Sequence, residues 1–210
     1  MQGLRRTTWI ALLLTVVCIF TIDQPLARWL ASRETHPIYW EIFIGYLEYL
    51  TGIVPDRWIG VWVLCIASAA TLLVPRLRPH AHGALLVTLV HLLDRNVTMW
   101  LKLGTGRLRP FEWLEHGGDR TFWFWGDGWS FPSGHITLFA SLCVPLAVAY
   151  PRLRPVLAIV VAAGCARILA HAHFVSDVLG GVALATAITW LCAAWLRRAL
   201  PSQIRPAYLR

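Results

Sequence analysis

The sequence has little charge for its length. Only 14% of its 210 residues are charged, whereas 57% are hydrophobic. Acidic residues are the scarcest kind, since 11 Asp and Glu face 19 Lys and Arg, which gives a net charge of +8. A soluble domain of this size needs more polar surface than this composition can supply. The composition therefore excludes an ordinary soluble globular domain and favours an integral membrane protein.

Several functional patterns are also missing. The cysteines stand singly in apolar segments, without CxxC or zinc spacing, which excludes a disulfide framework and a zinc site. No cluster of carboxylates is suited to holding a metal ion, and we expect no metal or other cofactor. The basic residues form short clusters instead of a continuous stripe, which argues against a nucleic-acid partner. The first apolar run lacks a small-x-small cleavage pattern, so we expect it to stay as an anchor helix.

Long apolar runs, in contrast, recur along the whole chain. They lie near residues 8–24, 58–74, 83–102, 134–150, 156–172 and 177–196. Each approaches the roughly 17–25 residues that a transmembrane helix needs. Prolines mark the joints between them, including Pro75, Pro151 and Pro201. The sequence thus predicts an all-α fold, a bundle of six transmembrane helices forming one membrane-embedded domain over residues 1–210.

The distribution of arginines predicts the orientation. With a cytoplasmic amino terminus, ten arginines in the inner segments are accompanied by no Asp or Glu: Arg5, Arg6, Arg76, Arg78, Arg152, Arg154, Arg197, Arg198, Arg205 and Arg210. Lys and Arg accumulate in cytoplasmic loops, so this orientation is favoured. The short basic loops suggest a bacterial inner membrane, with the remaining polar segments facing the periplasm or outside.

Two outer segments are rich in aromatic residues. The segment 37–50 in the first outer loop is too polar to span the bilayer, and we expect an interfacial amphipathic helix there. It could cover the mouth of the bundle or contact substrate. The second outer loop, 103–133, contains Phe122, Trp123, Phe124 and Trp125. These aromatics are typical of an interfacial belt, although they could also guide lipid tails.

Chemically active residues gather in three stretches at the predicted outer face. The first, from Lys102 to Arg109-Pro110, places cations around two glycines, a pattern suited to a closely approached anion. The second, Pro132-Ser133-Gly134-His135, opens a helix whose free amides can bind phosphate oxygens, although simple helix capping would also explain it.

The third stretch runs from Arg167 to Asp177. His173 and Asp177 have i, i+4 spacing, so on a helix the carboxylate could orient the imidazole. His171 would lie on a different helix face and is treated as a bystander. A structural ion pair inside the membrane is the alternative interpretation. Because three such stretches meet at one face, we expect a site for phosphoryl transfer through a histidine.

These stretches resemble the three signature motifs of the type 2 phosphatidic acid phosphatase superfamily. The family pattern is Lys, six residues, Arg-Pro; Pro-Ser-Gly-His; and Ser-Arg, five residues, His, three residues, Asp. The chain matches it over a motif core at 102–177, except that Ala166 replaces the serine before Arg167. One neutral hydrogen bond is worth about 0.5–1.5 kcal/mol net. We therefore expect this change to lower the rate without removing activity.

The resemblance implies a metal-independent lipid phosphate phosphatase with an extracytoplasmic site. In it, His173 would attack phosphorus and form a phosphohistidine, Asp177 would orient His173, and His135 would protonate the leaving alcohol and then activate water. The implied phosphate-binding residues are Lys102, Arg109, Ser133, Gly134 and Arg167. The substrate would be a membrane lipid phosphate or diphosphate. A lipid phosphotransferase with the same intermediate, or a non-catalytic lipid-binding or transport protein, remains an alternative.

Overall fold

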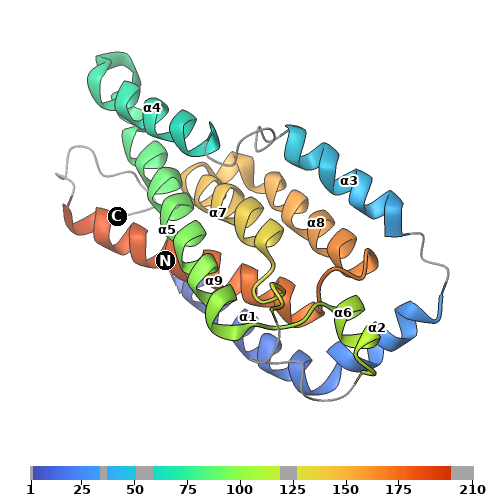
Figure 1. Ribbon diagram of the computed structural model, residues 1–210. Helices are drawn as coiled ribbons and strands as arrows, with labels where there is room; N and C mark the ends of the chain where they lie inside the picture. The colour runs from blue at the N-terminus through green and yellow to red at the C-terminus, as the bar shows by residue number, and fades with distance from the viewer. Residues whose placement is uncertain (1, 34–36, 51–58, 119–126, 200–210) are drawn as a thin grey trace.

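The computed structural model describes residues 2–33, 37–50, 59–118 and 127–199, and their regular structure is helical. The helices are α1 (Gln2–Thr21), α2 (Asp23–Ala31), α3 (Pro37–Leu50), α4 (Ile59–Leu73), η1 (Pro75–His80), α5 (Ala81–Thr105), α6 (Pro110–Glu115), α7 (Gly134–Ala149), η2 (Pro151–Val156), α8 (Leu157–Leu169) and α9 (Val175–Ala199). The all-α prediction is confirmed for these residues (Figure 1).

Each of the six predicted apolar runs forms a helix, namely α1, α4, α5, α7, α8 and α9. Three described segments are long and apolar enough to cross a membrane, Gln2–Thr21, Pro75–Glu115 and Val175–Ala199, whereas α4 and α7 are shorter apolar helices. The count of six crossings therefore stays a prediction. The predicted interfacial segment is helical as α3, and its position at the membrane interface also stays a prediction.

Helix α7 lies at the centre of the bundle, between α5, α8 and α9 (Figure 1). Most of its residues are buried, including Ile136 and Phe139, and its apolar residues are not confined to one face. A helix that is apolar all round is expected in such a central position. Gly164 on α8 allows close approach to α9, because a Cβ there would lie 2.9 Å from Val178 Cγ1. The side chains around α7 thus form the main apolar core.

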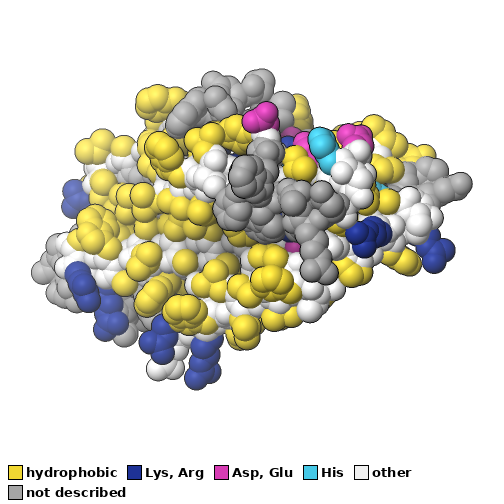
Figure 2. Space-filling view, turned by 60° about the horizontal axis from the view of Figure 1, so that its bottom comes forward, with side chains coloured by type: hydrophobic (Ala, Val, Ile, Leu, Met, Phe, Trp, Pro, Cys, Tyr) yellow, Lys and Arg dark blue, Asp and Glu magenta, His cyan; other side chains and the backbone are white. Residues whose placement is uncertain are grey.

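The outer surface of the bundle is also apolar. Large hydrophobic side chains are exposed along α1, α4 and α9, such as Phe20, Trp62 and Trp195. Figure 2 shows hydrophobic side chains spread over most of one face. Polar residues such as His91 and Asp94 are instead buried inside. An exposed apolar surface of this extent marks contact with a membrane or a partner.

The bundle has a basic end and an opposite end that carries the motifs. At the basic end, η1 and η2 hold Arg76, Arg78, Arg152 and Arg154. These two short helices lie close together, because Nδ1 of His80, the last residue of η1, is 3.3 Å from the hydroxyl of Tyr150, which directly precedes η2. Helix α5 starts there and α7 ends there, so the end of α5 and the start of α7 lie at the opposite end. Helix α8 follows η2 directly, so the connection from α8 to α9 also lies at the opposite end. All three motifs are therefore gathered there.

Candidate active site

The third motif occupies the connection between α8 and α9. Arg167 lies in the last turn of α8, which ends at Leu169, and Asp177 lies in the first turn of α9, which begins at Val175. The expectation that His173 and Asp177 share a helix is wrong, because His173 precedes α9. The backbone carbonyl of Arg167 accepts hydrogen bonds from the Ala172 and His173 amides, and these bonds hold the connection tight.

His173 and Asp177 nevertheless meet. Nδ1 of His173 lies 3.5 Å from Oδ2 of Asp177 and 3.4 Å from Oγ of Ser130. Ser130 donates its own hydroxyl hydrogen to Asp177 Oδ2 at 2.6 Å, and the Phe174 amide donates to the same oxygen at 2.8 Å. Both neighbours of Nδ1 are therefore acceptors, which places the imidazole hydrogen on Nδ1. The lone pair is then on Nε2, as a nucleophile requires.

Burial favours the neutral imidazole. The His173 side chain is 2% exposed, and its burial lowers the pKa well below the usual value for histidine. The hydrogen bond and charge of Asp177 act in the opposite direction, but they are the smaller effect. The neutral form of His173 is therefore favoured near neutral pH.

Arg107 is the main residue that the sequence analysis missed. It is fully buried, and Nη1 donates to Asp177 Oδ1 at 2.5 Å while Nη2 donates to Asp23 Oδ2 at 2.8 Å. Its guanidinium also stacks 4.3 Å from the centre of the Phe174 ring. Ser176 accepts a further hydrogen bond from Nη1 at 2.7 Å and is bound to Asp23 through its amide and its hydroxyl. Arg107 therefore fixes Asp177 and joins α2 to the site.

The second motif forms the start of α7. Gly134 is the first helical residue and Ser133 occupies the N-cap position, but the Ser133 side chain makes no cap hydrogen bond. Its hydroxyl is buried and has no hydrogen-bond partner among the described residues. The capping interpretation is therefore not supported. The Ser133 amide donates to the Asp177 carbonyl at 3.0 Å, which ties α7 to α9. The next amides belong to the first turn, where helices offer donors to anions.

The first motif meets the second at the same place. A Cβ on Gly134 would lie 3.5 Å from Cε and 4.0 Å from Nζ of Lys102, so the ammonium lies at the start of α7. Nζ donates to the Trp129 carbonyl. Arg109 precedes α6, and its charge acts on both Lys102 and Arg167. Lys102, Ser133 and Gly134 therefore meet at the start of α7, and the phosphate-binding roles of these residues and of Arg109 and Arg167 stay predictions.

Helix α3 contributes two carboxylates that the sequence analysis did not select. Glu41 contacts Nη1 of Arg167 through both oxygens, at 2.9 and 2.8 Å. Glu48 lies 2.8 Å from Nε2 of His135. The two glutamates are seven residues apart and therefore lie on one face of α3. Ile44, between them, is 2% exposed and belongs to the core around α7.

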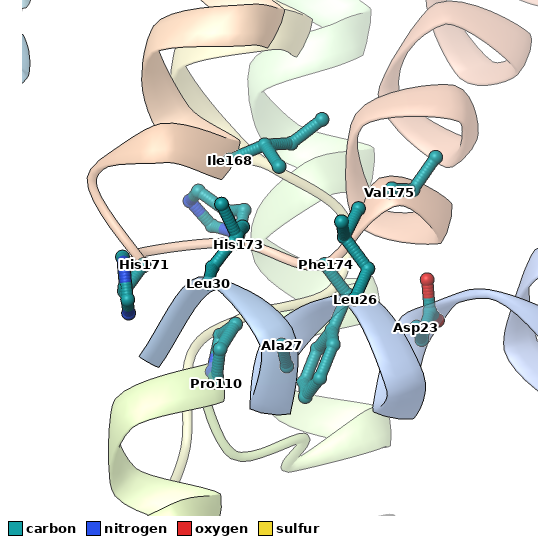
Figure 3. Close-up of a pocket in the computed structure, with 10 residues that line it drawn as sticks. All are labelled: Asp23, Leu26, Ala27, Leu30, Pro110, Ile168, His171, His173, Phe174 and Val175. Carbon is teal, nitrogen blue, oxygen red and sulfur yellow. The ribbon is translucent and has the colours of Figure 1, made fainter. Parts of the chain in front are cut away.

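A small cavity lies beside His173. It is lined by residues of α2, the start of α6 and the α8–α9 connection, and Figure 3 shows Leu26, Ala27 and Pro110 around it. Its volume of about 10 Å³ is enough for one water molecule and too small for a phosphate group. His171 also lines the cavity, but its side chain points in a different direction from that of His173 (Figure 3).

Ala166, the departure from the family motif, is fully buried and belongs to the same apolar core cluster as Ile136. A serine hydroxyl at this position would have to find an acceptor within that cluster. The effect of the missing hydroxyl on the rate stays a prediction. Of the aromatic residues in the second outer loop, Phe122, Trp123, Phe124 and Trp125 lie outside the described residues.

Comparison with known proteins agrees with this geometry. A family model described as the PAP2 superfamily matches residues 83–201, which include all three motifs. No curated protein matches the chain. Among solved structures, the chain is similar to a transmembrane PAP2-type phosphatidylglycerolphosphate phosphatase from Bacillus subtilis, with a TM-score of 0.59 and 21% identity over 96% of this chain and 100% of that chain. The helices that are long and apolar enough to cross a membrane, together with the exposed apolar surface, support an integral membrane protein. Because the family model covers more than half of its length, the chain belongs to the PAP2 superfamily.

Proposed function

We propose that the protein removes phosphate from a membrane lipid phosphate or diphosphate through a phosphohistidine intermediate. One observation carries the proposal: a buried, neutral His173, oriented by Asp177, lies at the end of the bundle where the first turn of α7 and several cations are gathered. Cations and helix amides stabilise the charge of a transferring phosphoryl group, and a neutral imidazole is a suitable nucleophile.

The reaction has two steps. In the first, Nε2 of His173 forms a bond to phosphorus, the bond from phosphorus to the lipid oxygen breaks, and His135 gives a proton to that oxygen. In the second, His135 removes a proton from water, the water oxygen attacks phosphorus, and the N–P bond breaks to release inorganic phosphate. Lys102, Arg109 and Arg167 would neutralise the phosphoryl oxygens throughout.

Positions of the basic loops support an extracytoplasmic site. The arginines of η1 and η2 lie at the end of the bundle opposite the motifs. If these arginines are cytoplasmic, as the positive-inside rule favours, the site opens to the periplasm or outside. We infer six membrane crossings and a bacterial inner membrane from the same pattern.

The substrate is best identified by measuring phosphate release. The purified protein, in detergent and in vesicles, would be given phosphatidylglycerophosphate, phosphatidic acid, a polyprenyl diphosphate and a lipid A type glycolipid. The similar Bacillus subtilis protein makes phosphatidylglycerophosphate the first choice. Release of inorganic phosphate is expected from at least one lipid. Transfer to an added acceptor lipid in place of release would identify a phosphotransferase, and binding without turnover would identify a non-catalytic lipid-binding protein.

Removing divalent metal ions is expected to leave this activity largely unchanged. The proposed chemistry assigns the charge of the phosphoryl oxygens to Lys102, Arg109 and Arg167, and the nucleophile to His173, so no step requires a metal ion. The measurement compares initial rates with and without a chelator, and with excess Mg²⁺ added back. A large loss that Mg²⁺ restores would contradict the metal-independent mechanism.

A further inference from the structure

The site contains two histidine–carboxylate pairs in different environments. In the pair of His173 and Asp177, the side chains are 2% and 0% exposed. In the pair of His135 and Glu48, they are 27% and 26% exposed, and the contact from Nε2 to Oε1 is 2.8 Å. When two similar groups lie in environments that give them different proton affinities, they can take different acid–base roles.

The Asp177 carboxylate is shared among several donors. Arg107, Ser130 and the Phe174 amide all donate to it, and the Arg107 guanidinium offsets its charge. Asp177 therefore orients His173 without giving it a strong preference for a second proton. Together with burial, this favours the neutral imidazole of a nucleophile.

Glu48 is suited to the opposite effect on His135. It projects from α3, which packs on α8 and is anchored by the buried Ile44. The hydrogen bond with His135 lowers the pKa of the Glu48 carboxyl, and the charge of Arg167 acts in the same direction. The carboxylate is thus ionised near neutral pH, and an ionised acceptor favours the protonated form of its imidazole partner.

We propose that Glu48 is a positioning residue for His135, holding Nε2–H by a hydrogen bond and stabilising the imidazolium that protonates the leaving group. This proposal rests on the proposed function. Because Nε2 is held by Glu48, Nδ1 is the nitrogen that gives its proton to the leaving oxygen. The same nitrogen then accepts a proton from the attacking water, and Nε2 keeps its hydrogen in both steps.

Other charged groups around the site oppose or support a proton on His135. Lys102 on α5, Arg109 before α6 and Arg167 on α8 are cations, and a like charge nearby disfavours an imidazolium. Glu41 on α3 offsets Arg167 through its two contacts, and Asp177 is paired with Arg107. Among the described residues, Glu48 is the carboxylate that directly contacts the His135 ring.

Replacing Glu48 with glutamine tests the charge while keeping an acceptor oxygen at nearly the same place. The alkaline limb of the kcat/KM profile reports the acid that must be protonated in the free enzyme. In Glu48→Gln this limb is expected to move to lower pH by about 0.5–1 unit, a range that allows for the partial exposure of the pair. Glu48→Asp, which retains the charge, is expected to shift the limb less.

The matched control is Glu115→Gln, which removes the same charge from an exposed position on the last turn of α6. It is expected to leave the alkaline limb in place. If Glu115→Gln moves the limb as far as Glu48→Gln does, the effect is one of overall charge and the proposal is overturned. A wild-type alkaline limb in a folded Glu48→Gln protein would overturn it as well.

A second measurement does not depend on turnover. In protein labelled at histidine, the NMR signal of His135, assigned with a His135→Gln variant, is expected to titrate at lower pH in Glu48→Gln than in wild type. An unchanged midpoint would reject the role of Glu48. A different result would reject the proposed function and leave the pairing intact. In that case the wild-type protein releases no phosphate from any lipid, yet the His135 midpoint is lower in Glu48→Gln than in wild type.

Discussion

Replacing His173 with asparagine is expected to reduce phosphate release by at least about 10³-fold, because the reaction then lacks its nucleophile. Asparagine fills much of the same space and retains an N–H that can donate to Asp177. The loss should therefore appear in kcat without a comparable loss of thermal stability. Trapping with a lipid carrying a radioactive phosphate should label the wild-type protein and leave His173→Asn unlabelled.

His171→Asn is a closely matched control. His171 is two residues away, lines the same small cavity and has a positive φ of 57°, which asparagine tolerates well. This variant is expected to retain at least about half of the wild-type rate, since His171 is only partly buried and the proposed mechanism gives it no role. Substantial turnover by His173→Asn would remove His173 as the nucleophile. A complete loss in His171→Asn would transfer the role to His171.

Replacing Arg107 with methionine is expected to damage both stability and activity. The change leaves Asp23 and Asp177, two fully buried carboxylates, without their shared cation. Breaking a buried ion pair by removing one partner costs about 3–5 kcal/mol. Thermal unfolding in detergent should show a markedly lower midpoint, and phosphate release should fall because Asp177 loses the contact that fixes its carboxylate.

Arg109→Met separates these two effects. Arg109 is two residues further along and is only partly buried, and the proposed function assigns it to the phosphoryl oxygens. The Arg109→Met change is expected to raise KM or lower kcat while leaving the unfolding midpoint close to that of wild type. If Arg107→Met unfolds at the wild-type temperature, the structural role of Arg107 is wrong. If Arg109→Met retains full activity, its assignment to phosphate binding is wrong.

Local patterns predicted much of the fold. Long apolar runs located all six of the helices α1, α4, α5, α7, α8 and α9, because a long apolar run has few alternatives to a helix in a membrane. The start of α7 at Gly134 followed from the helix-opening pattern around Ser133. The i, i+4 spacing selected His173 and Asp177 as a pair, and the resemblance to the family motifs added their expected roles.

Long-range contacts could not be predicted in the same way. Asp23 meets Arg107 across 84 positions and Glu41 meets Arg167 across 126, and no local periodicity encodes such distances. A signal was available for Arg107, since it lies in the same cation-rich stretch as Lys102 and Arg109. The helical expectation for His173 failed because hydrogen bonds from Ala172 and His173 to the Arg167 carbonyl close the connection as a tight turn before α9.

The contact between Glu41 and Arg167 has a consequence for turnover. If Arg167 binds the phosphoryl group as proposed, this cation already holds an internal carboxylate between reaction cycles, and an incoming phosphoryl group would have to exchange with Glu41. The same exchange would favour departure of the product, because Glu41 would compete with inorganic phosphate for Arg167. Helix α3 would thus make the site resistant to retaining its own product at the cost of weaker substrate binding.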